Sequence, residues 1–435
     1  MRSASGQDRR ADPGHDGSDP LLSVRGLRKH YPVTTGLLGR EVERVRAVDG
    51  VDFDVGRGET LGLVGESGCG KSTVASTALR LEEPTDGTIR FDGEPVTELG
   101  DRALQRFRRR AQLVFQDPNA TFNPRMTVAE AVGEPLSIHG MADRDRRRAI
   151  VRDLLERVGL DGIDLDRHPQ AFSGGQKQRL ALARSLVLDP DLLVADEPVS
   201  GLDVSVQASV LSLMADLQET FDLSILFISH DMSVVREFCD RIAVMYLGEI
   251  VERGPVESVF EDPAHPYTKA LLEAIPAPDA TGPPAEPLAG EVPDATDPPD
   301  GCRFHTRCPV LIQPEGLDLD AATWHRVFEF RQAVERGDIE LAEFVDGDAG
   351  GEAAGADLDA ALRTEFDLPA PLGDEQAEAA LGEAVDHLIA GDDEAATVRL
   401  RDVFVSPCER GDSDGRISER PRRDGEGTYR CERPH

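Results

Sequence analysis

Nine consecutive residues combine three glycines, a lysine and three hydroxyls in a pattern suited to holding phosphate: Gly65, Glu66, Ser67, Gly68, Cys69, Gly70, Lys71, Ser72 and Thr73. The order Gly-x-x-x-x-Gly-Lys-Ser is that of a phosphate-binding loop, in which glycines let successive backbone N–H groups surround phosphate oxygens. Lys71 could reach the β- and γ-phosphates of a nucleotide, and the Ser72 hydroxyl could ligate Mg²⁺. The apolar run 60–64 predicts a buried strand before the loop, and 74–81 predicts a helix after it. This setting disfavours the alternative, a glycine turn that happens to precede a lysine.

Two carboxylates follow another apolar run. Residues 192–195 predict a buried strand, and Asp196 and Glu197 come directly at its end. Paired acids at a buried strand tip are costly unless they do chemistry. Asp196 suits Mg²⁺ binding through water, and Glu197 suits a general base that polarises an attacking water. A third apolar run, 224–228, leads to His230. A lone histidine is usually structural, but one at the C-terminal tip of a parallel strand is more often functional.

Polar residues also stand at the ends of other predicted elements. Gln116 follows the short predicted strand 112–115. Ser173 can cap a helix that Gly174 and Gly175 open, which would leave N–H groups available to an anion; an ordinary glycine-rich helix start is the alternative. A tight turn at 200–203 leads into the next predicted helix. The Tyr31 ring could stack on a purine base, although plain sheet packing is its more ordinary role.

Taken together, and in this order along the chain, these motifs resemble the ATP-binding subunit of ABC transporters. Residues 65–73 match its Walker A loop, Gln116 its Q-loop, Asp196 and Glu197 its Walker B strand, 200–203 its D-loop and His230 its switch histidine. The signature segment of that family is matched by Ser173, Gly174, Gly175 and Gln176. The resemblance covers about residues 21–255. It implies an α/β P-loop NTPase fold with a RecA-like core, an antiparallel β-subdomain and a helical subdomain at about 117–188.

The same resemblance implies an ATPase and a set of roles. The Walker A residues, Tyr31, the signature residues and Asp203 would contact ATP, with Tyr31 as the adenine-stacking aromatic. Glu197, His230 and Gln116 would be catalytic, and Mg²⁺ would be held through Ser72, Gln116 and Asp196. Two such subunits, identical or paralogous, would sandwich two ATP molecules, so that each Walker A loop faces the signature of the other subunit. Gln116 and its loop would sense a membrane permease.

Three segments narrow the resemblance to importers of dipeptides and oligopeptides: 114–128, 202–207 and 264–272. This implies a subunit peripheral to the cytoplasmic face of the membrane, two permease subunits, and indirectly an extracellular solute-binding protein. Nickel importers share much of this pattern, so uptake of nickel or another small solute is the alternative. A DNA-repair ATPase would need a long coiled coil between loop and signature, where only about 100 residues lie. A two-cassette translation factor would need a second Walker A loop.

Four late cysteines match the ending of the same importer ATPases: Cys302, Cys308, Cys408 and Cys431. Four thiolates can hold a [4Fe–4S] cluster or a structural Zn²⁺, and the resemblance favours the cluster. Four ordinary free cysteines are the alternative. Cys69, in the phosphate loop, and Cys239, in a predicted core helix, do not look like ligands.

The charge balance is strongly acidic. The 82 acidic and 48 basic residues give a net charge of -34, and only four of the basic residues are lysines. Such acidity argues against nucleic acid as the main partner. The acidity is compatible with a basic partner or with disordered acidic tails. It also resembles the composition of proteins from halophilic archaea, and we favour this last interpretation. Six cysteines are too few for a disulfide scaffold, which favours a cytosolic protein.

We expect four regions along the chain. Residues 1–20 form a disordered tail, 21–255 the ATPase domain, 256–300 a C-terminal helix and linker, and 301–435 the cysteine region. The cysteine region contains an acidic insertion at 313–405, whose role the sequence does not reveal. Helices are predicted at 321–341 and 375–389, and disorder at 346–356. In the β-subdomain, 34–44 is predicted as a loop between two strands.

Overall fold

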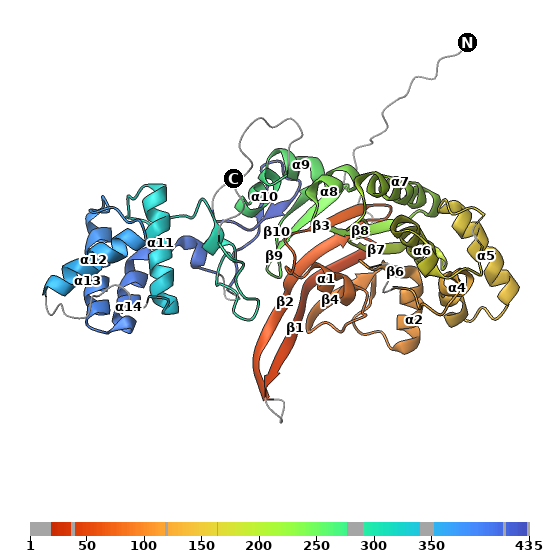
Figure 1. Cartoon of the computed structure of the whole chain (residues 1–435), viewed down its shortest axis with the longest axis horizontal. Coiled ribbons are helices and arrows are strands. Elements are labelled where there is room, and N and C mark those ends of the chain that lie inside the picture. The colour runs from red at the N-terminus through yellow and green to blue at the C-terminus, as the bar shows by residue number, and fades with distance from the viewer. Residues whose placement is uncertain are drawn as a thin grey trace, which may run out of the picture. The chain divides into compact units, whose positions relative to one another are not determined.

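The computed structural model describes residues 19–35, 40–117, 121–162, 164–275, 290–339, 352–411 and 415–432. They belong to two compact units that divide between Glu249 and Ile250, here called the N-terminal unit and the C-terminal unit. Figure 1 shows their elements, coloured along the chain. The tail expected at 1–20 lies outside the described residues up to residue 18, and so does the first part of the expected linker, 276–289.

A parallel sheet forms the centre of the N-terminal unit. Its strands lie in the order β9 (Arg241–Tyr246), β3 (Thr60–Val64), β8 (Ser224–Ser229), β7 (Leu192–Asp196) and β6 (Ala111–Val114). The three middle strands are buried along their whole length, as expected for short apolar runs in a parallel sheet. Because the strands are parallel, the residues after Val64, Val114, Asp196 and Ser229 all emerge at one edge.

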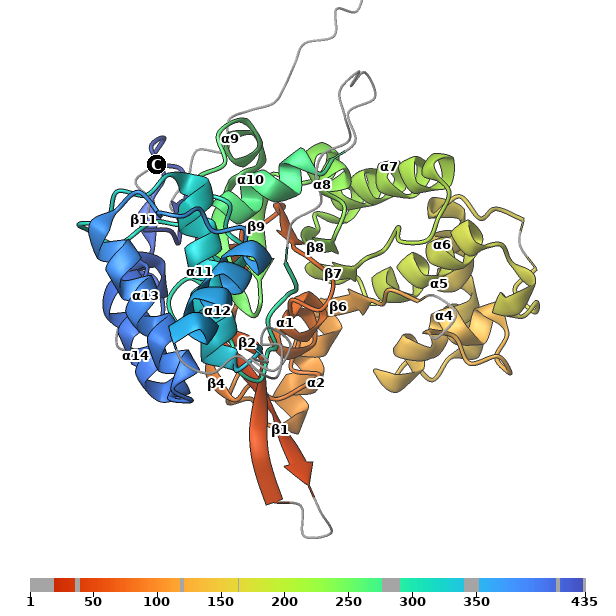
Figure 2. The same cartoon turned by 60° about the vertical axis from the view of Figure 1, so that its left-hand side comes forward.

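An antiparallel sheet forms the second layer of this unit, in the order β2 (Arg40–Val55), β1 (Leu22–Thr35), β4 (Asp86–Phe91) and β5 (Glu94–Pro95). The loop predicted at 34–44 is mostly wrong, because β1 continues to Thr35 and β2 begins at Arg40. Val33 pairs with Glu43 and Thr35 with Arg40, so ladder hydrogen bonds extend the hairpin where the polar sequence suggested a loop. Figure 2 shows this hairpin projecting beyond the other strands.

The described helices of the N-terminal unit fall into two groups: some lie along the sheet, and three others form a cluster. The phosphate loop leads into α1 (Lys71–Ala78), and α2 (Asp101–Arg110) precedes β6. The cluster contains α4 (Val128–Ile138), α5 (Arg144–Arg157) and α6 (Gly174–Leu186), which contact one another. Thr127 caps α4 through a capping box with Glu130, and Asp143 caps α5. Next come α7 (Val204–Phe221) and α8 (Met232–Phe238). The RecA-like core, β-subdomain and helical subdomain expected from the sequence are therefore confirmed.

The C-terminal unit begins with a small strand and helix region. Strand β10 (Glu249–Pro255) pairs with β12 (Thr428–Tyr429), which pairs with β11 (Arg420–Pro421). Between them lie α9 (Val256–Glu261) and α10 (Pro266–Glu273). The last residues of the described chain thus return to strand β10, which carries the first residues of the unit.

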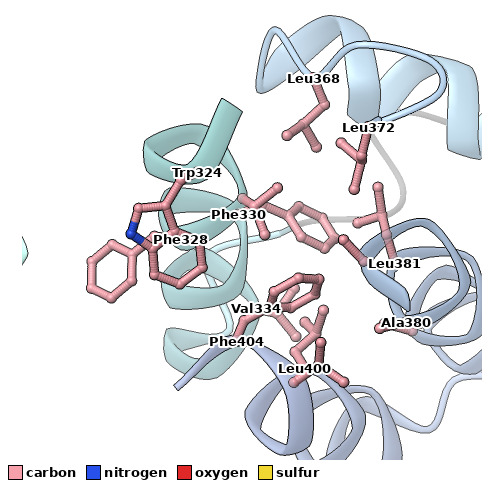
Figure 3. Close-up of a cluster of buried hydrophobic side chains, with 14 of the residues drawn as sticks. Trp324, Phe328, Phe330, Val334, Leu368, Leu372, Ala380, Leu381, Leu400 and Phe404 are labelled. Carbon is pink, nitrogen blue, oxygen red and sulfur yellow. The ribbon is translucent and has the colours of Figure 1, made fainter. Parts of the chain in front are cut away.

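The acidic insertion forms four helices around one hydrophobic core, which also includes Leu311 and Cys408 on either side of the insertion. They are α11 (Ala321–Arg336), α12 (Glu352–Glu365), α13 (Glu375–Ile389) and α14 (Asp393–Phe404). Figure 3 shows Phe330, Leu381 and Leu400 pointing toward one another between these helices. Helix α13 has the predicted bounds. Helix α11 ends before residue 341 because Gly337 adopts a left-handed conformation, with φ 70°. The prediction of disorder at 346–356 is wrong from Glu352 onward, where α12 begins, and its earlier part lies outside the described residues.

Within the described ranges, no helix is both long enough and apolar enough to span a bilayer.

Candidate active site

The phosphate loop has a backbone shape that only glycine permits at two positions. Gly65 and Gly70 have φ angles of 154° and 109°, and a Cβ atom on either would lie 2.0 Å from a backbone carbonyl oxygen, that of Met245 or Ala47. Lys71 is only 5% exposed, and its ammonium donates to the carbonyls of Gly65 at 2.8 Å and Glu66 at 2.9 Å. The lysine is therefore folded inside the loop, within reach of the space that the loop encloses.

Ser72 and Asp196 lie together at the edge of the sheet. Their side chains hydrogen-bond across the gap between α1 and the end of β7. Burial raises the pKa of Asp196, the nearby Glu197 carboxylate adds to this, and the Ser72 hydroxyl opposes it. Oxygen Oδ1 of Asp196 is buried, and no hydrogen-bond partner is found for it among the described residues. A hydroxyl and an unsatisfied carboxylate oxygen are a donor set that fits Mg²⁺.

Glu197 is contacted from two sides by the other residues predicted to be catalytic. Gln116 donates from Nε2 to Oε2 of Glu197 at 2.8 Å, and His230 Nδ1 lies 3.1 Å from Oε1. The three residues follow β6, β7 and β8, so the parallel sheet brings them together from positions far apart in the chain. Glu197 has a φ of 47°, in the left-handed region that a non-glycine residue rarely adopts. Such backbone strain is common where a side chain must be aimed at a functional position.

Tyr31 lies beside the phosphate loop. Its hydroxyl donates to Oε2 of Glu82 at 2.5 Å, and it also interacts with the Thr73 side chain. Burial, with help from the Glu82 carboxylate, raises the pKa of Tyr31 to about 12. Lys29 Nζ lies 4.9 Å from the ring centroid, so a cation covers part of one ring face. Sequence reasoning missed Glu82 and Lys29 as ring supports, because Glu82 lies 51 residues away from Tyr31.

The signature segment stands at the start of α6. Ser173 caps the helix and shares a capping box with Gln176. A Cβ atom on Gly174 would touch Leu202, and one on Gly175 would lie 2.5 Å from Val206, so this segment packs against the D-loop and the start of α7. Asp203 and Val204 are exposed next to it, Val204 at 82%. These residues share an exposed part of the N-terminal unit, and no side-chain hydrogen bond from Asp203 caps α7.

The four late cysteines line one cavity in the C-terminal unit, together with His265, Phe304 and His305. Burial raises the pKa of the Cys302 and Cys408 thiols. Fully buried His265 has its pKa lowered to about 3. Its Nδ1 accepts the Tyr267 N–H, so we assign the ring proton to Nε2, which lies 3.8 Å from Cys302 Sγ. Sequence reasoning missed His265, although it stands in the segment 264–272 that resembles peptide importers.

This thiol cavity contains the right donor atoms without a ready-made metal site. Its volume is about 10 Å³, close to the least that one water molecule needs. In the part of the chain that the structure describes, no three or more His, Cys, Asp or Glu side chains are arranged to hold a metal ion. The chemistry of four thiols fits an iron–sulfur or zinc centre, whereas their present spacing does not.

Comparison with known sequences agrees with this geometry. Residues 48–200 match the family described as ABC transporter, and 251–313 match the oligopeptide/dipeptide transporter C-terminal region. Residues 321–419 match a domain of unknown function, DUF8228.

Two curated relatives illustrate the similarity. The oligopeptide transport ATP-binding protein AppF of Bacillus subtilis (strain 168) is 48% identical over 67% of this chain and 90% of its own length. The di/tripeptide transport ATP-binding protein DppF of Pseudomonas aeruginosa is 46% identical over 68% of this chain and 91% of its own. With nearly the whole length of such relatives matched at this identity, the chain belongs to the ABC transporter ATPases, in the oligopeptide/dipeptide importer family.

Proposed function

We propose that this ATPase energises the uptake of dipeptides or oligopeptides through a membrane permease. The observation that carries the proposal is the placement of Glu197 between Gln116 and His230 at the edge of the sheet where Ser72 and Asp196 also lie. It is supported by relatives whose names refer to oligopeptide and di/tripeptide transport.

In the proposed mechanism, the N–H groups of the phosphate loop and the Lys71 ammonium hold the β- and γ-phosphates. Ser72, Asp196 and Gln116 would hold Mg²⁺, which neutralises phosphate charge when it is bound. Glu197 accepts a proton from the attacking water as the water oxygen bonds to the γ-phosphorus and the bond to the ADP oxygen breaks. His230 orients the Glu197 carboxylate through their 3.1 Å contact. Tyr31 offers its ring to the adenine.

The proposed assembly contains two ATPase subunits and two permease subunits at the cytoplasmic face of the membrane, with a solute-binding protein as an indirect partner. The second ATPase subunit is another copy or a paralogue. Support comes from the exposed signature segment and D-loop, since Ser173, Gly174 and Asp203 are accessible to a second subunit. In this arrangement the signature of one subunit completes the ATP site of the other.

Transport assays in the source organism can separate peptide import from the nickel alternative. A strain that lacks this chain should lose uptake of labelled di- and tripeptides and keep nickel uptake. The wild-type gene should restore peptide uptake, whereas a Lys71→Ala copy, expressed at the same level, should not. Unchanged peptide uptake together with lost nickel uptake would replace the peptide proposal with the nickel one.

We also propose that the four late cysteines bind a thiolate-ligated centre, with [4Fe–4S] preferred over Zn²⁺. Their position around one cavity supports this, with Cys302 half-buried and the other three buried. Because the cavity is small, the thiols must move apart to admit a cluster. Anaerobically purified protein should then contain iron and acid-labile sulfide, about four of each per chain, and Cys302→Ser should lose both. One zinc per chain would favour the structural zinc site, and metal-free protein with four alkylatable thiols would contradict either centre.

Finally, we propose that the acidic composition is an adaptation to high salt, as in halophilic archaea. The excess of 82 acidic over 48 basic residues supports this, as does the presence of only four lysines. Carboxylates spread over a surface repel one another unless salt screens them.

A further inference from the structure

The two ends of the acidic insertion meet at the thiol cavity. The Ser406 hydroxyl donates to the carbonyl of Ile312 at 2.6 Å, which joins the residue before the helices to the one after them. The N–H of Cys302 donates to the carbonyl of Cys408 at 2.8 Å. Cys408 therefore reaches Cys302 because the chain that leaves into the insertion returns beside its starting point.

Helix α11 holds the backbone of the cysteine segments directly. Nε2 of His325 lies 2.7 Å from the carbonyl oxygen of Cys308. Arg331, at 1% exposure, donates to Glu409 at 2.5 Å and to Glu335 at 2.6 Å. Glu409 follows Cys408 in sequence. The side chains of His325 and Arg331 therefore connect α11 to the segments of Cys308 and Cys408. The ring of Phe328, also on α11, packs edge-on against His305 at 5.7 Å.

The insertion and the cavity also share one hydrophobic core. The cluster that contains Trp324, Phe330, Leu381 and Phe404 includes Cys408, and Cys302 packs against it. If the helical domain were only tethered through a surface loop, its hydrophobic core would be separate from the residues of that loop. Here, two of the four thiols lie within or against the core of the helical domain.

We propose that the helices α11–α14 serve as a cover for the thiol cavity, holding Cys308 and Cys408 in place and keeping the thiols from solvent. This assigns a role to the segment that matches a domain of unknown function. The proposal does not depend on whether a metal is bound, because the contacts that carry it join backbone, ring and charged groups around the thiols.

Arg331→Met in the full-length protein tests the proposal. It leaves the partly buried Glu409 carboxylate without its arginine, while Glu335 keeps its ion pair with Arg401, and so should loosen α11 from Glu409. Arg363→Met is the matched control: Arg363 is also largely buried and also binds two carboxylates, Asp359 and Glu378, but both lie within the helical domain. We would measure how fast a soluble thiol reagent labels each cysteine in the folded protein, by mass spectrometry, and record the metal content of each sample.

Arg331→Met should speed labelling of Cys308 and Cys408 by about tenfold or more relative to Arg363→Met, because a lost buried pair raises the population of locally open states. Cys239, in the N-terminal unit, should label at the same rate in all samples. If Arg331→Met fails to fold, His325→Ala, which removes the contact to Cys308 and one exposed contact within α11 to Ala321, should still give an increase of a few fold. Equal rates in the Arg331 and Arg363 variants, or thiols that label rapidly in the wild-type protein, would overturn the proposal.

Discussion

Lys71 and Glu197 illustrate how the site works at the scale of single residues. Both side chains are held by neighbours on the protein: Lys71 by two loop carbonyls, and Glu197 by Gln116 and His230. Each residue could be predicted from its motif, because a phosphate loop and a strand ending in two acids carry a local sequence pattern. Their partners could not be predicted from periodicity or spacing, since Gln116 lies 81 residues from Glu197 and only the order of strands in the sheet brings them together.

Lys71→Ala should weaken nucleotide binding itself. The loop would lose the one side-chain ammonium that its own carbonyls hold in place, and with it a charge on the β- and γ-phosphates. Equilibrium titration with a labelled ATP analogue checks this, and Lys177→Ala, a lysine in the first turn of α6, is the control. Unchanged affinity in Lys71→Ala would count against the phosphate-loop assignment.

At the scale of single elements, the short strands β11 and β12 help to position Cys431 at the thiol cavity. Strand β12 pairs with β10, and the buried pair of Glu252 and Arg422 holds the turn beside it. Arg422 also donates to the carbonyl of Ser258, within α9, and to that of Asp262, directly after it. This arrangement places Cys431, which follows β12 by two residues, at the thiol cavity. The pair could not be predicted, because 170 residues separate its members.

Arg422→Met should destabilise the C-terminal unit by about 3–5 kcal/mol, because it leaves the Glu252 carboxylate buried without its positively charged partner. Burial already raises the pKa of Glu252, and the charge of Arg422 opposes this rise. In Arg422→Met the pKa of Glu252 should therefore be higher still. Where folding raises the pKa of a carboxyl, the protein loses stability as the pH rises from the unfolded-state pKa to the folded-state pKa. The loss of stability in Arg422→Met should therefore be smaller at pH 5 than at pH 8.

Urea unfolding, followed by the fluorescence of Trp324, the only tryptophan, measures this loss of stability. The half-exposed pair Arg420 and Glu432 provides the control, since Arg420→Met should cost about 0–1 kcal/mol. Equal losses in the two variants would be the contrary result.

The helical insertion shows where element prediction fails. Helix α13 could be predicted because its apolar residues recur at helical spacing after an acidic N-cap, Asp374. Helix α14 carries a similar stripe, Ala396, Leu400, Val403 and Phe404, which sequence reasoning did not use. The segment 346–356, which overlaps the start of α12, was predicted to be disordered, but Leu358 and Leu362, four residues apart, bury α12 in the common core. A few well-spaced large residues therefore outweighed an acidic composition.

For the whole molecule, the charge balance sets the response to salt. With 82 acidic against 48 basic residues, carboxylates repel over a Debye length of about 30 Å at 0.01 M salt and about 3 Å at 1 M. The midpoint of thermal unfolding should therefore rise markedly from dilute buffer to molar KCl. A midpoint indifferent to KCl would contradict the proposed adaptation to salt.

ATP hydrolysis requires all parts of the site in the N-terminal unit to act together. The variant Glu197→Gln is the sharpest test of the proposed hydrolysis mechanism. The amide cannot accept the proton of the attacking water, whereas the phosphate loop, Lys71 and Tyr31 are left unchanged. We predict that the variant binds MgATP with wild-type affinity and hydrolyses it about 100-fold more slowly or worse. Binding and hydrolysis should be measured on the same preparations, in molar KCl. Near-normal hydrolysis by the variant would contradict the assignment of Glu197 as the base and, with it, the proposed mechanism.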